Sequence, residues 1–162
     1  MTEAEALSIL RGDDAAAAAR AEASLWAMWS RSGDAGVDSL LREGVEAIER
    51  QDLEAAEGCF TRVIAREPAF AEGWNKRATV RYLAEHFEES IADCRETLAR
   101  NPNHFGALSG QGLCHIALAQ YREAAALFRR ALEVHPHLGA ARRNLSVAVA
   151  EAVRGNGHGD HA

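Results

Sequence analysis

The 162-residue sequence has no apolar run approaching the ~20 residues needed to cross a bilayer. Its first stretch, MTEAEALSILRGDD, also lacks the basic start and apolar core of a secretory signal. Hydrophobic residues make up 48% and charged residues 26% of the chain, which is the balance of a folded, soluble protein rather than a disordered one. We therefore expect a cytoplasmic protein with no membrane insertion. An organelle stroma or the periplasm is the alternative if a targeting segment has been removed.

Cysteine is scarce and is not spaced for a metal site or a disulfide framework. Cys59, Cys94 and Cys114 are odd in number and include no C-x-x-C pair, which argues against both kinds of structure. Each lies in a helical pattern, so we expect buried, reduced thiols.

Positive charge is also in short supply. The chain has 18 Lys and Arg against 24 Asp and Glu, for a net charge of −6. Because nucleic-acid binding needs a basic stripe that displaces counterions, no nucleic-acid partner is expected.

The sequence lacks the motifs of catalysis as well. Its glycine-rich stretch GALSGQGL (106–113) has neither G-x-G-x-x-G nor G-x-S-x-G spacing and lies within a helical pattern. The pair His158-x-x-His161 stands in a glycine-rich end that is more typical of a solvated tail than of a metal site. We therefore predict a protein that is not an enzyme, with no catalytic residue, no metal and no cofactor.

Proline is as scarce as cysteine, but its placement is regular. The interval from Pro68 to Pro102 equals the interval from Pro102 to Pro136. Aligning the blocks on these prolines brings residues of similar size into register: Leu40, Trp74 and Leu108; Gly44, Ala78 and Gly112; Ala56, Ser90 and Ala124; Phe60, Cys94 and Phe128. Small residues let two helices approach, and bulky residues fill the space between them. Each block therefore predicts a pair of packed helices, with turns at Gln51-Asp52, Glu85-His86 and Ala119-Gln120.

These blocks resemble tetratricopeptide repeats (TPRs), whose unit of about 34 residues is a helix–turn–helix with this small/large code. The proline interval has the length of this unit. The resemblance implies an all-α fold: a TPR helical-hairpin solenoid that forms a right-handed superhelix of about 3.5 repeats plus a capping helix. Ser90 departs from the usual alanine, and Arg81 and His115 stand where an aromatic residue is common. The expected segments are N-terminal helices forming a degenerate repeat (1–36), TPR 1 (37–70), TPR 2 (71–104), TPR 3 (105–138), a capping helix (139–154) and a disordered tail (155–162).

The N-terminal segment fits the same register less closely. Shifting back by one unit places Trp26 and Trp29 at the positions of Phe60 and Val63, so we expect the array to begin before residue 37. At i, i+3 spacing, the two tryptophans are interpreted as sealing the core of the first repeat. An aromatic ligand clamp is the alternative.

In TPR geometry, the first helices of successive units line a concave groove. Polar residues from adjacent helices are expected to meet there, beside glycines that would admit a ligand backbone. Asn75 can donate to and accept from an extended peptide, and Arg143 can hold a carboxylate. The predicted function is therefore a non-catalytic protein–protein interaction scaffold that binds a peptide segment of a partner. The predicted partner-binding residues are Asn75, Lys76, Thr79, Tyr82, Gly106, Ser109, Gly110, Leu113 and Arg143.

Two other functions stay open at this point. Arg81 and His115 occupy the same repeat position one unit apart, so a small-ligand binder or an enzyme-complex subunit could use them together. A self-associating structural protein is the third interpretation.

The best-known groove of the family is the carboxylate clamp of co-chaperones, which grips the acidic C-termini of heat-shock chaperones. Its polar and charged residues would have to stand at Leu41, Val45, Lys76, Gly106 and Gly110, and Lys76 alone is charged. On this ground we predict a protein or peptide partner that is not a carboxylate-clamp chaperone partner.

Three further stretches, SLWAMWSRSG, AEGWNKRAT and HFGALSG, are similar to a small group of TPR proteins from bacteria and plastid-bearing eukaryotes. This second resemblance implies no particular activity.

Overall fold

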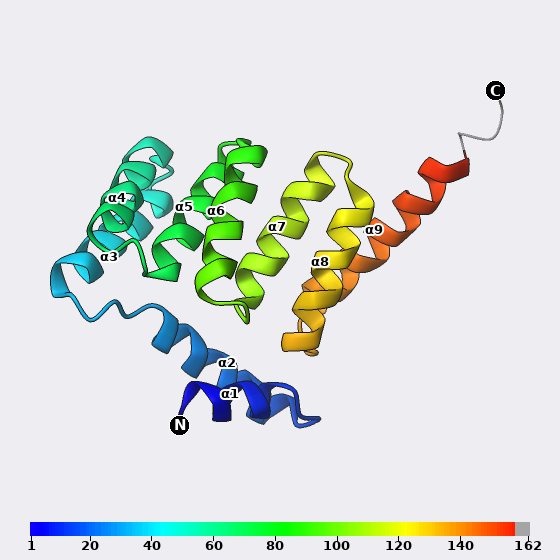
Figure 1. The fold of residues 1–162 in the computed structure, drawn as a ribbon, viewed down its shortest axis with the longest axis horizontal. Helices are drawn as coiled ribbons and strands as arrows, with labels where there is room; N and C mark the ends of the chain where they lie inside the picture. The colour runs from blue at the N-terminus through cyan, green and yellow to red at the C-terminus, as the bar shows by residue number, and fades with distance from the viewer. Residues whose placement is uncertain (158–162) are drawn as a thin grey trace.

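The computed structural model describes residues 1–157, which form nine α-helices and no strand. The all-α solenoid predicted from the repeat period is confirmed (Figure 1). The helices are α1 (Glu3–Leu10), α2 (Ala15–Trp29), α3 (Ala35–Glu49), α4 (Leu53–Arg66), α5 (Ala71–Leu83), α6 (Phe87–Arg100), α7 (Phe105–Ala117), α8 (Tyr121–Val134) and α9 (Gly139–Gly157). Within this described part, no helix is long and apolar enough to cross a membrane.

The turn inside each repeat has the same backbone conformation. Gln51, Glu85 and Ala119 have φ angles of 61°, 61° and 56° and stand at the same position of successive repeats. This left-handed conformation ends the first helix of a repeat and reverses the chain into the second. All three residues lie in the turns that the sequence predicts.

Close approach of the two helices in a repeat depends on glycine. A Cβ placed on Gly112 would lie 2.8 Å from the Phe128 ring, and one on Gly44 would overlap the Phe60 ring. Phe60 and Phe128 have no exposed surface. The small residue in the first helix of a repeat therefore packs against the large residue in its second helix.

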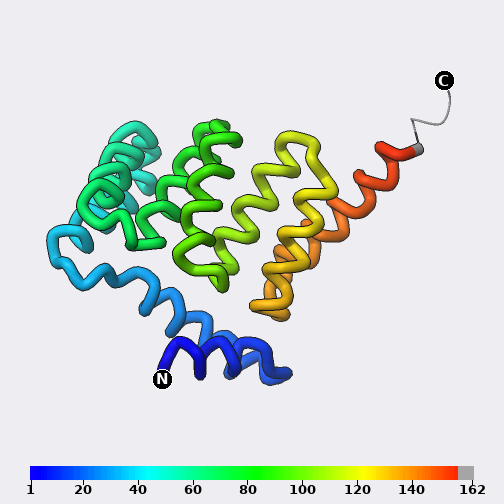
Figure 2. The backbone as a smooth tube through the Cα atoms, viewed as in Figure 1, coloured from blue at the N-terminus to red at the C-terminus, as the bar shows by residue number. Residues whose placement is uncertain are grey.

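The N-terminal helices α1 and α2 form a hairpin that folds back beneath the array instead of extending it (Figure 1). Leu10 and Leu25 are fully buried in a cluster that includes Phe105 and Val134. This placement differs from the expectation that the pair stacks before the first repeat and that its tryptophans seal that repeat's core. The apolar side chains of the hairpin pack with residues of α7 and α8, which follow in the chain after two intervening repeats. In Figure 2 the backbone of the hairpin passes below these two helices.

Hydrogen bonds from the last inter-repeat loop hold the hairpin in this place. His135 Nε2 donates to Glu22 Oε2 at 2.9 Å, and His137 Nε2 donates to the Gly12 carbonyl at 2.7 Å.

The last helix, α9, covers the end of the array by packing on α8. Ala141 and Ala148 are buried against Ala124 and Phe128. The helix continues to Gly157, past the predicted end of the capping helix at residue 154, so the first part of the expected tail is helical. His158 and His161 lie outside the described residues.

Candidate functional site

A cavity of about 140 Å³ lies on the array between α5, α6 and α7. It brings together six of the nine predicted partner-binding residues: Asn75, Thr79, Tyr82, Gly106, Gly110 and Leu113. Ala78, Ser90 and Cys94 complete its lining. The remaining three, Lys76, Ser109 and Arg143, do not line this cavity. Lys76 turns to Glu72, with its Nζ 3.7 Å from Glu72 Oε1.

Beneath the cavity lies a buried polar cluster that the sequence did not predict. The Glu72 side chain is fully buried, and its Oε1 accepts a 3.1 Å hydrogen bond from Asn75 Nδ2. Its Oε2 lies 2.8 Å from His104 Nε2. Asn75 therefore has one amide hydrogen committed inside the protein, which leaves fewer of its groups for a ligand than the sequence suggested.

The hydrogen bond at Nδ1 of His104 determines which ring nitrogen carries the hydrogen. Nδ1 accepts the backbone N–H of Ala107 at 3.0 Å and thereby caps α7. Because that nitrogen must be unprotonated to accept, the ring proton is on Nε2, which donates to Glu72. Trp29 stacks on the same ring at 4.8 Å, and Trp26 meets it edge-on at 5.3 Å. His104 thus joins the start of α7, the groove helix α5 and the N-terminal hairpin.

The two glycines predicted on the concave side differ in what they face. A Cβ on Gly106 would lie 2.7 Å from Trp26 Cη2, so the hairpin fills that position. A Cβ on Gly110 would meet one atom within 4 Å, Cys94 Sγ at 3.9 Å. Gly110 is therefore the position at which the groove floor is open.

The space around Gly110 and the close contact of Gly112 with Phe128 predict opposite effects of an alanine substitution at these two positions of α7. Gly110→Ala is expected to raise the free energy of unfolding by up to about 1 kcal/mol, because alanine favours the helix and the site has room. Gly112→Ala is expected to lower it, because the added methyl overlaps the Phe128 ring. Urea denaturation followed by circular dichroism measures both. Equal effects of the two substitutions would contradict the assignment of Gly110 to an open floor.

The three cysteines are free thiols. Burial raises the pKa of Cys94 and of Cys114 above the usual range, so both stay protonated and weakly nucleophilic at neutral pH. Cys94 contributes an apolar sulfur atom to the groove wall.

Arg81 and His115, the pair considered for a small-ligand site, are each occupied separately. Arg81 Nε is 2.9 Å from Glu57 Oε1, and its Nη1 is 3.0 Å from Asp93 Oδ2. His115 Nδ1 is 2.7 Å from Gln120 Oε1. Because Arg81 binds acidic residues and His115 binds Gln120, the two side chains do not form a shared ligand pocket. This arrangement favours the scaffold interpretation.

Asp93 is the centre of this ion-pair network. Its side chain is 3% exposed and accepts two hydrogen bonds from Arg77, at 2.8 and 2.9 Å. Hydrogen bonding to Asp93 raises the pKa of Arg77. The network joins α5 and α6, the two helices of the second repeat, and reaches α4 of the first repeat through Glu57.

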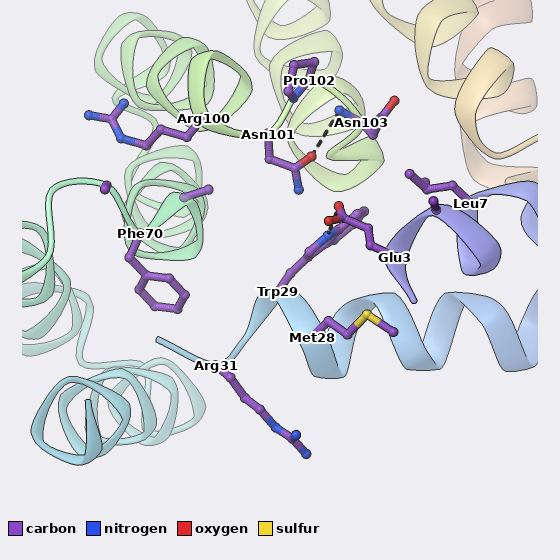
Figure 3. Close-up of a pocket in the computed structure, with 13 residues that line it drawn as sticks. Glu3, Leu7, Met28, Trp29, Arg31, Phe70, Arg100, Asn101, Pro102 and Asn103 are labelled. Atoms are coloured by element: carbon purple, nitrogen blue, oxygen red, sulfur yellow. Dashed lines mark hydrogen bonds between the residues drawn. The ribbon is translucent and has the colours of Figure 1, made fainter. Parts of the chain in front are cut away.

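A second and larger hollow, of about 530 Å³, lies between the N-terminal hairpin and the first two inter-repeat loops (Figure 3). Of its lining residues, the sequence singled out Trp29, in the alternative interpretation of the two tryptophans as an aromatic ligand clamp. Its lining includes Glu3, Met28, Trp29, Phe70, Asn101 and Asn103. The repeat period alone does not predict the hollow, because the hollow exists only where the hairpin folds back.

The stacked helix pairs, the shared turn and the open concave floor define a helical-repeat protein. The tetratricopeptide-repeat model matches residues 41–105 and 109–156. The chain belongs to the tetratricopeptide repeat family.

A TPR repeat-containing protein of Rhizobium etli is 30% identical over 128 residues, which are 79% of this chain and 62% of the relative. Three eukaryotic relatives are matched over 22–34% of their lengths. The chain thus spans less than two thirds of each of these relatives.

Solved structures share the fold. The first TPR of Spaghetti (RPAP3), bound to the HSP90 peptide SRMEEVD, superposes with a TM-score of 0.71 at 22% identity, covering 72% of this chain and 93% of that one. The TPR2B domain of yeast Sti1 in complex with pHsp70 has a TM-score of 0.65 at 25% identity, covering 73% and 96%. A Thermobaculum terrenum O-GlcNAc transferase has a TM-score of 0.66 at 22% identity, covering 70% of this chain but 22% of the transferase chain.

The prediction that excluded a carboxylate-clamp chaperone partner is wrong. Two of the repeat domains that share this fold are solved with HSP90 and Hsp70 ligands. That prediction assumed that the residue types at five positions alone decide whether a groove binds such a peptide. Groove shape and other polar side chains also contribute to peptide binding.

Proposed function

We propose that the chain is a non-catalytic protein–protein interaction scaffold whose concave groove binds a peptide segment of a partner. The observation that carries this proposal is the cavity over Gly110, where polar and apolar side chains from three helices surround an open floor. Such a mixture of an apolar surface with a few polar groups is typical of a binding site.

Each wall of the cavity offers a different contact to a peptide. Tyr82 is half-buried beside Phe87, with ring centroids 5.7 Å apart, and Leu113 adds an apolar surface from α7. Thr79 is exposed and its hydroxyl already donates to the Asn75 carbonyl, so its oxygen remains an acceptor for a ligand. Gly110 between them leaves room for a backbone in extended or helical form.

The ligands of the similar domains supply candidate peptides. Spaghetti (RPAP3) is bound to the acidic peptide SRMEEVD, and Arg143 on α9 is an exposed cation on the predicted concave side. We therefore include acidic peptides of this chaperone type in the ligand class.

The test compares the wild type with Gly110→Leu in capture of partners from the native host and in titration with SRMEEVD. Leucine at this position projects into the cavity and is expected to lower peptide affinity at least ~10-fold, equivalent to about 1.4 kcal/mol. The stability of the variant should be unchanged or slightly higher, because leucine favours a helix over glycine. Val149→Leu on α9 is the matched control, since Val149 is 39% exposed and does not line the cavity. Capture of the same partners by wild type and Gly110→Leu would show that the groove is not the site.

A further inference from the structure

The hollow beneath the array is a second candidate binding site, distinct from the groove. In Figure 3, Trp29 rises from the end of α2 between Phe70 on one side and Glu3 on the other, and the Asn101 amide points toward it. Its volume of about 530 Å³ falls within the range of small-ligand sites, roughly 300–1,000 Å³.

Comparison of equivalent positions in the repeats indicates which kind of group can fill this hollow. Phe70, His104 and Leu138 occupy equivalent positions in the three inter-repeat loops, one repeat period apart. The hairpin covers the second with Trp26 and Trp29, and the third packs against the apolar cluster of the same hairpin. The first, Phe70, is half-buried and lines the hollow. Phe70 also packs against the core of the first repeat. The hairpin therefore covers two of the three equivalent loop positions, and the third faces the hollow.

The two covered positions indicate the chemistry of a ligand that would fit the hollow. At His104, the contact is made by aromatic side chains of a peptide segment, with one ring stacked at 4.8 Å and the other edge-on at 5.3 Å. Phe70 offers an aromatic ring at the equivalent place, and Trp29 and Met28 line the same hollow from α2. Aromatic rings and a thioether are favourable neighbours for another aromatic side chain.

Polar groups at the rim suit the peptide backbone that would carry such a side chain. Asn101 Oδ1 accepts the Asn103 backbone N–H at 3.2 Å. Throughout residues 1–157, the Asn101 Nδ2 group and the Asn103 side-chain amide make no hydrogen bond. Side-chain amides without an internal hydrogen bond can bind the N–H and C=O groups of a peptide.

The charges around the hollow do not favour an anionic ligand. Arg100 is already paired with Glu96 at 2.6 Å, and its guanidinium lies over the Trp74 ring at 4.7 Å. Glu3 contributes a carboxylate, which accepts a 2.9 Å hydrogen bond from Trp29 Nε1. Arg31 extends away from the hollow in Figure 3. These contacts favour a neutral aromatic group.

We propose that this hollow binds a peptide segment of a partner protein through one aromatic side chain. The side chain lies against Phe70 and Trp29, and the flanking peptide groups bind the amides of Asn101 and Asn103. The hollow and the groove cavity share no lining residue, so a partner can occupy the hollow independently of the groove.

The experiment titrates the full ¹⁵N-labelled chain with the peptide Ac-Gly-Trp-Gly-NH₂ and follows amide and indole NMR signals. We expect saturable, millimolar binding that shifts the Trp29 indole N–H and the side-chain amides of Asn101 and Asn103. Ac-Gly-Ala-Gly-NH₂, which lacks the aromatic group, should leave these signals in place. Absence of any shift up to the solubility limit of the tryptophan peptide would overturn the proposal.

Three variants separate this site from the groove. Ala69→Trp places an indole in the hollow from an exposed lining position and should weaken binding at least ~10-fold by occupying the space. Asn103→Ala should weaken it by about 3-fold through loss of one amide contact, and it serves as the milder test if Ala69→Trp does not fold. Gly110→Leu should leave binding unchanged. Unaltered affinity in Ala69→Trp and Asn103→Ala, or loss of affinity in Gly110→Leu, would show that the peptide binds elsewhere.

Discussion

Replacement of His104 by alanine is expected to lower the free energy of unfolding by about 2–4 kcal/mol, chiefly because it removes a hydrogen bond to a buried carboxylate, worth about 1.5–3 kcal/mol. The substitution removes the 2.8 Å donor of the buried Glu72 carboxylate. It also removes the cap of α7, worth about 1 kcal/mol, and the ring on which Trp29 stacks. Urea denaturation followed by circular dichroism measures the loss, and tryptophan fluorescence reports the change around Trp26 and Trp29.

His86→Ala is the matched control for this prediction. His86 precedes α6 as His104 precedes α7, but it is exposed and makes no side-chain capping hydrogen bond. Its replacement should change stability by no more than about 0.5 kcal/mol. Similar losses at both histidines would mean that the buried pair with Glu72 contributes little.

The second large effect is expected for Asp93→Ala, which should lower the free energy of unfolding by about 3–5 kcal/mol. Arg77 and Arg81 both bind the buried Asp93 carboxylate, and the guanidinium groups of both are left within the second repeat without it. Their side chains are 14% and 18% exposed, so solvent cannot fully replace the lost acceptor. Thermal and urea denaturation measure this change.

Glu89→Ala tests whether the cost comes from burial rather than from charge alone. Glu89 also lies near Arg81, at 3.7 Å, but its side chain is 61% exposed. An exposed pair of this kind contributes about 0–1 kcal/mol, so the variant should remain close to the wild type. A loss below about 1 kcal/mol for Asp93→Ala would show that the two arginines find other partners.

The array could be predicted from the sequence because its determinants are local and repeated. Gly112 and Phe128 lie within one repeat, and Gly44 and Phe60 form the equivalent contact two repeats earlier. The left-handed turns recur at the same position of each unit. Each unit packs on its neighbour, so a pattern that fits within one repeat determines most of the contacts.

The candidate groove could be predicted in part for the same reason. Repeat geometry placed Asn75, Thr79 and Gly110 on one surface, and all three line one cavity. It did not predict that Asn75 donates to a buried Glu72, because that depends on His104 from the next inter-repeat loop. Glu72 precedes Asn75 by one helical turn, so a carboxylate beside the predicted site residues was the one available signal.

The hairpin and the hollow beneath the array could not be derived from the period. Their contacts join residues such as Glu22 and His135, 113 positions apart, between segments with no common spacing. The positions of Trp26 and Trp29 also fit the register of a preceding repeat, so the pattern alone does not reveal the folded-back hairpin. Which surface they cover depends on the complementary shape of Gly106 and the ring of His104.

The return of the N-terminal hairpin to the far end of the array has a consequence for how the chain folds. A solenoid made of neighbouring contacts can fold outward from any repeat, whereas the Glu22–His135 contact closes a loop of 113 residues. At a synthesis rate of about 5–20 residues per second, the hairpin waits roughly 5–25 seconds before its docking surface on α8 is made. Its apolar residues, among them Leu10 and Leu25, stay uncovered in that interval. Once closed, the contact ties the N-terminal hairpin to the last repeat, so these two parts are expected to unfold together rather than by separate fraying of each end.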